Sequence, residues 1–109
     1  MSTVDALNQQ IKDLEELVAR RDKALRLEKV PEFRDVILQD FCVTECARYA
    51  QLSGDPALKK ENREDALALA QAAGHLRRYL SVIVQMGNRA VDEIVQVKEA
   101  LEEAHREEA

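Results

Sequence analysis

Apolar residues recur every three or four positions in the first part of the chain, which is the spacing of one face of an α-helix. The steps between them are three, four, three, four and seven. This first stripe consists of Val4, Leu7, Ile11, Leu14, Val18 and Leu25. β-branched residues at the a positions with leucine at d are typical of two-stranded coiled coils. The pattern predicts a coiled-coil-like helix over 3–29, interrupted where Arg21 takes a d position, and Leu17 and Leu27 widen its apolar face.

A second helix is predicted over 31–52. Pro31 ends the first helix at or before Val30 and suits the first position of the next one. One apolar stripe at α-helical spacing consists of Phe33, Val36, Ile37, Phe41, Ala47 and Ala50, and an adjoining stripe of Cys42, Cys46 and Tyr49. Apolar positions therefore surround much of this helix, and we expect it to be the most buried element. Gly54 and Pro56, on either side of Asp55, then mark the strongest break in the chain.

A third helix is predicted over 61–106. Its first half repeats apolar residues at threes and fours, and many of them are alanines, which let a neighbouring helix approach closely. Its second half carries the steps four, three, four and three from Ala90 through Ile94, Val97 and Leu101 to Ala104. Gly87 is a candidate break, but a single glycine costs only about 1 kcal/mol in a helix. A continuous helix of this length would extend roughly 70 Å.

The fold class that follows is all-α. The chain has few aromatic residues, three glycines and two prolines, whereas an all-β fold needs many more turn residues. We expect a single domain over 1–109, built as an elongated antiparallel helical bundle or hairpin with coiled-coil-like terminal helices. The two terminal stripes must be buried, either against each other or against another copy. The candidate self-association seam is Val4, Leu7, Ile11, Leu14, Val18, Leu25, Ile94, Val97 and Leu101, and we expect a homo-oligomer.

The charge pattern narrows the set of partners. A formal net charge of −5 disfavours nucleic acid and anionic membranes, because both require a basic footprint. The acidic residues near the end of the chain indicate a solvated helix end or, alternatively, a tail that docks on a basic partner. The first residues lack the basic-then-apolar pattern of a signal peptide, and no stretch has the roughly 20 apolar residues of a membrane span. We therefore expect a soluble cytoplasmic protein with free thiols.

Few residues suggest chemistry. Cys42 and Cys46 share a helix face, but His75 and His105 do not complete a metal-ligand spacing, so we interpret both cysteines as core residues. Arg77, Arg78 and Tyr79 form the one basic–aromatic cluster, a candidate contact for an anion or a protein partner. No phosphate loop, nucleophile elbow or zinc-protease motif is present. We expect no catalytic, cofactor or metal site.

One resemblance adds to this interpretation. Residues 31–41 (PEFRDVILQDF), 45–48 (ECAR), 54–57 (GDPA) and 74–80 (GHLRRYL) resemble a group of small helical proteins of tailed bacteriophages. The resemblance covers roughly 29–87, and Cys42 and Cys46 depart from it, because that group has small or apolar residues there. It implies a non-enzymatic protein of virion structure or assembly, bound to itself and to a larger virion component, in the bacterial host cell or the virion. The alternative is a host-takeover or anti-defence protein that inhibits a bacterial protein or sequesters a nucleotide signal.

Overall fold

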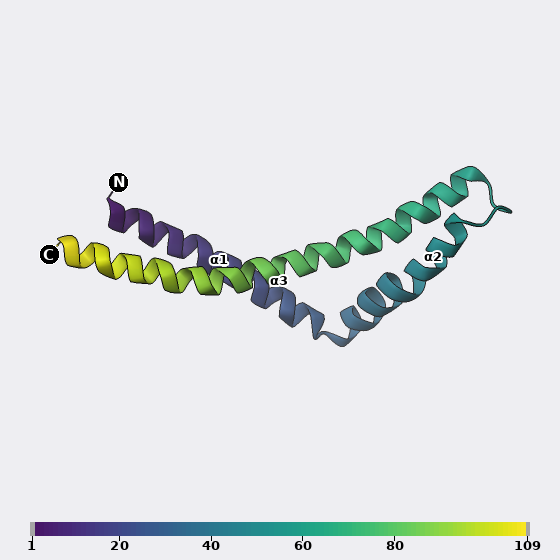
Figure 1. Ribbon diagram of the computed structural model, residues 1–109. Helices are drawn as coiled ribbons and strands as arrows, with labels where there is room; N and C mark the ends of the chain where they lie inside the picture. The colour runs from purple at the N-terminus through teal and green to yellow at the C-terminus, as the bar shows by residue number, and fades with distance from the viewer. Residues whose placement is uncertain (1, 109) are drawn as a thin grey trace. The chain divides into compact units, whose positions relative to one another are not determined.

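The computed structural model describes residues 2–108, and helices account for nearly all of them (Figure 1). In chain order they are α1 (Thr3–Glu28), the π-helix η1 (Phe33–Glu45), α2 (Cys46–Ser53) and α3 (Lys60–Glu108). Residues 2–108 contain no strand, so the predicted all-α class is confirmed. Positions 1 and 109 of the predicted domain lie outside the described residues.

Local signals in the sequence fix the helix ends. The Ser2 hydroxyl accepts a hydrogen bond from the backbone N–H of Asp5 at 3.1 Å and so caps α1. Pro31 follows the end of α1 as predicted. The Asp55 carboxylate accepts the backbone N–H of Ala57 at 2.9 Å, which closes the turn after α2. The third predicted helix is confirmed as one continuous helix that passes through Gly87.

Two compact units make up the chain. The first consists of residues 2–25 and 82–108, and the second of residues 26–81.

The terminal unit pairs the first part of α1 with the last part of α3 in antiparallel order (Figure 1). Ile11 and Leu14 form its buried core with Ala90 and Val97. The half-buried residues packed against this core are Leu7, Leu17, Val18, Ile94 and Leu101. Of the two pairings that the sequence left open, the structure has the one within the chain.

Arg21 and Gly87 are the two irregular positions of the heptad stripes, and they lie against each other in this unit. A Cβ atom added to Gly87 would overlap the Cβ of Arg21, so the helices meet at a distance that only glycine allows. The Arg21 guanidinium then reaches the side-chain oxygen of Asn88 at 3.0 Å and that of Asp22 at 3.0 Å. The long arginine thus occupies a seam position while its charge stays hydrogen-bonded.

The predicted α-helix over 31–52 is wrong for its central part, because residues 33–45 form a π-helix. A π-helix bonds each N–H to the carbonyl five residues back, so that its turns are wider and residues four to five apart share a face. The N–H of Cys46 makes such a bond to the carbonyl of Phe41. Phe33, Ile37, Leu38, Phe41, Cys42 and Cys46 follow this wider spacing, and all are buried or half-buried.

The wider turn also corrects the predicted burial. Among residues 33–53 only Cys42 is buried, so this segment is not the most buried element. Val36, which α-helical spacing assigns to the core stripe, is 57% exposed, and Ala47 and Ala50 are exposed too. The second unit instead draws much of its core from the α3 residues Ala66, Ala73 and Leu80.

Candidate functional site

Cys42 and Cys46 connect η1 and α2 to α3 inside the second unit. The Cys42 thiol lies 4.0 Å from the carbonyl oxygen of Ala73, and the Cys46 thiol lies 3.5 Å from that of Ala70. Both sulfur atoms reach backbone oxygens because alanine side chains leave the surface of α3 open. The predicted close approach to the alanines of α3 is therefore present, and the cysteines take part in it as packing residues.

Burial raises the pKa of the Cys42 thiol above its usual range. The nearby charge of Arg77 acts in the opposite direction, and Cys46 adds to the rise. The buried position therefore favours the neutral thiol, whereas metal binding and nucleophilic chemistry need the thiolate. Within residues 2–108, no group of three or more histidine, cysteine or acidic side chains is placed to hold a metal ion.

We expect the two thiols to react at different rates. At pH 8, iodoacetamide should alkylate half-buried Cys46 roughly tenfold faster than buried Cys42. The thiolate is the reactive form of a cysteine, and burial disfavours the thiolate of Cys42. Peptide mapping by mass spectrometry at successive times measures both rates in one sample. The contribution of Cys42 to stability should be complete below the ordinary thiol pKa of about 8.5 and should decline as the pH rises above it. Equal alkylation rates in the folded chain would contradict this assignment.

Arg77, Arg78 and Tyr79 are exposed residues of α3. Because consecutive residues of an α-helix point in directions about 100° apart, the three side chains do not converge on one side of the helix. Arg77 is near enough to Cys42 to influence its pKa. Tyr79 is 54% exposed. The three side chains of the sequence cluster therefore leave α3 in different directions, and the geometry offers no single cradle for a phosphate.

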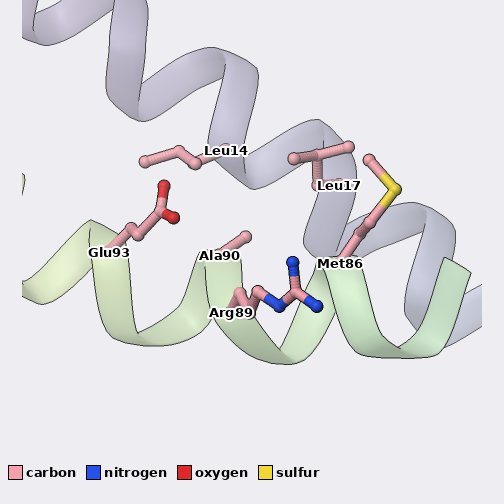
Figure 2. Close-up of a pocket in the computed structure, with 6 residues that line it drawn as sticks. All are labelled: Leu14, Leu17, Met86, Arg89, Ala90 and Glu93. Atoms are coloured by element: carbon pink, nitrogen blue, oxygen red, sulfur yellow. The ribbon is translucent and has the colours of Figure 1, made fainter. Parts of the chain in front are cut away.

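A shallow hollow lies between the two helices of the terminal unit (Figure 2). Leu14 and Leu17 of α1 line it together with Met86, Arg89, Ala90 and Glu93 of α3. Figure 2 shows the carboxylate of Glu93 extending from α3 toward α1, while Leu17 and Met86 approach each other at the other end. Its floor is apolar, and its rim carries one positive and one negative side chain.

The hollow has a volume of about 160 Å³, whereas sites for small molecules and cofactors usually enclose roughly 300–1,000 Å³. A space of this size accepts one large apolar side chain. Knobs-into-holes packing of helices uses holes of this kind, in which one side chain inserts between residues of the facing surface. The geometry therefore suits contact with another helix better than the binding of a metabolite.

The seam residues named from the sequence mostly meet in this unit. Val4 is half-buried, and Leu7 through Val18 pack with Ile94, Val97 and Leu101. Leu25, however, is 36% exposed, and its neighbour Ala24 is buried instead. Beyond Arg21 the buried face of α1 is therefore offset by one residue from the heptad stripe.

Sequence reasoning missed Met86, Arg89 and Glu93 as partners in one site. Met86 and Glu93 flank the α3 seam at equivalent heptad positions, seven residues apart, and this is the signal that could have drawn attention to them. Leu17 holds the corresponding flanking position on α1. Only the antiparallel pairing places Leu17 beside Met86 and so creates the hollow.

Comparisons with protein-family models, curated proteins and solved structures found no match to this chain. None of the helices in residues 2–108 is both long enough and apolar enough to cross a membrane.

Proposed function

We propose that this chain is a non-enzymatic interaction protein that acts through helix–helix contacts, as a structural or assembly component of a tailed bacteriophage. The observation that carries the first part is the hollow of the terminal unit, which has the size and lining of a helix-packing hole. The assignment to a phage particle is drawn from the sequence resemblance of residues 29–87.

Exposed apolar side chains support the proposal. Val91 and Val95 of α3 are 40% and 56% exposed, on a flank that α1 does not cover. Single exposed apolar residues are ordinary, but neighbouring ones along a helix flank are the surface that a further helix buries. A larger virion protein with an amphipathic helix fits this description.

Self-association is part of the proposed function, but it uses a surface other than the heptad seam. The seam residues of the terminal unit already contact one another within the chain. Residues used in that way are not available to a second copy unless the unit opens. The oligomer should therefore form mainly through residues that flank the seam.

Mass spectrometry of particles purified from the virus that encodes the chain tests the proposal. We expect the chain in mature particles or in assembly intermediates, at a fixed ratio to the major structural proteins. Repeated purification on a density gradient controls for loosely adhering host proteins. Absence from both kinds of particle, together with co-purification with a bacterial protein early in infection, would instead support the host-directed inhibitor.

A further inference from the structure

We propose that the hollow of the terminal unit is the docking site for a second copy of the chain, joined through a twofold axis that sets Arg89 of each copy against Glu93 of the other. The inference rests on the proposed function as an interaction protein and identifies the partner of one surface. The occupant of the hollow is the corresponding surface of a second molecule of the same chain.

The charges on the rim are self-complementary. Arg89 and Glu93 are four residues apart on α3, a rise of about 6 Å, and both are exposed. Within the described part of the chain neither residue forms an ion pair or a side-chain hydrogen bond. A twofold axis between their levels turns the second copy end for end, so that each arginine faces a glutamate and both pairs form together.

The apolar part of the hollow suits the same arrangement. Met86 is 38% exposed at its edge, and Leu17 beside it is half-buried (Figure 2). Methionine is unbranched and flexible, so it fills irregular gaps in a facing surface. A space of about 160 Å³ resembles the cavities that accept a benzene-sized group, and a methionine side chain is of comparable bulk. Met86 and Leu17 therefore give each copy an apolar edge beside its charged rim, and a facing copy can cover that edge.

A partner with a uniformly charged helix would satisfy only half of this rim. A basic helix pairs with Glu93 but meets Arg89 with repulsion, and an acidic helix does the reverse. Equal and opposite charges one helical turn apart are matched by a surface with the same pair in reverse order. A second copy in antiparallel orientation presents that surface, because the twofold axis reverses the order of Arg89 and Glu93.

Charge reversal gives a direct test by sedimentation equilibrium and native mass spectrometry of the full chain. Arg89→Glu leaves two glutamates on the rim, and Glu93→Arg leaves two arginines. Each variant alone should dimerise at least about tenfold more weakly than the unaltered chain, because like charges then face each other. Mixed in equal amounts, the two variants should form a heterodimer, and the double variant Arg89→Glu with Glu93→Arg should again form a homodimer.

Glu99→Arg is the matched control for Glu93→Arg, because it also replaces a glutamate by an arginine on α3. It lies on the face of α3 opposite the seam and should leave dimerisation unchanged. Circular dichroism of each variant verifies that the fold is retained. A monomeric unaltered chain at about 100 μM would overturn the inference, and so would an oligomer that neither reversal weakens. These measurements use the purified chain, so their outcome is independent of whether the chain is found in phage particles.

Discussion

Replacing Val97 by aspartate should lower the free energy of unfolding by about 3 kcal/mol, one of the largest effects expected from a single substitution in this chain. Val97 is 8% exposed in the core between α1 and α3, beside Ile11 and Leu14. The carboxylate would be buried there without a partner, and burying an unpaired charge is costly. Urea denaturation followed by circular dichroism measures the change, and the melting temperature should fall by roughly 10 °C.

Val95→Asp is the matched control for this experiment. It introduces the same side chain two residues earlier on the same helix, at a position that is 56% exposed. Its carboxylate stays in water, so the free energy of unfolding should change by no more than about 0.5 kcal/mol. Similar losses for the two variants would show that the buried face of α3 has been assigned incorrectly.

Gly87→Ala should destabilise the chain even though alanine is the better helix former. The gain in helix propensity is about 1 kcal/mol. Against it stands the overlap of the new Cβ with the Cβ of Arg21, which is rigidly attached to the backbone of α1 and cannot rotate away. Overpacking of this kind typically costs about 1–3 kcal/mol, and here the helices must move apart to relieve it. We expect a net loss of about 1 kcal/mol and a melting temperature lower by several degrees.

Gly74→Ala supplies the opposite result from the same chemical change. Nothing lies within 4 Å of a Cβ added at Gly74, which is exposed on α3. Only the propensity gain remains, so the chain should become more stable by about 1 kcal/mol. Opposite signs for the two alanine variants, measured by thermal unfolding, would support the close approach of Arg21 to Gly87. Stabilisation by both variants would exclude it.

The two heptad irregularities illustrate how far local pattern extends. From the sequence, Arg21 is a fault in one stripe and Gly87 a candidate break in another, and each is judged by itself. In the antiparallel unit they are complementary, because the missing side chain of Gly87 makes room for the stem of Arg21. Their relation depends on which helices pair and in what register, and neither is written in the spacing of a single stripe.

The segment 33–45 shows where the assumed period failed. Phe33, Phe41 and Cys42 fit both an α-helical stripe and a π-helical one, since spacings of four occur in each. Val36 distinguishes the two, because a core position in the first becomes an exposed position in the second. Counting apolar steps with an α-helical template therefore predicted the helix but not its winding or its buried face.

The sequence by itself determined the all-α class and the two breaks that separate the three helical segments, because capping residues, proline and apolar spacing act within a few residues of one another. It favoured a long third helix but left its continuity at Gly87 open, and the structure shows that the helix passes through Gly87. Tertiary structure alone decided that the terminal stripes pair within the chain, that Ala24 replaces Leu25 in the buried face, and that Met86, Arg89 and Glu93 border a common hollow. These features require two helices to meet in one register. The free energy that selects that register comes from contacts between residues some 70 positions apart, which no local pattern contains.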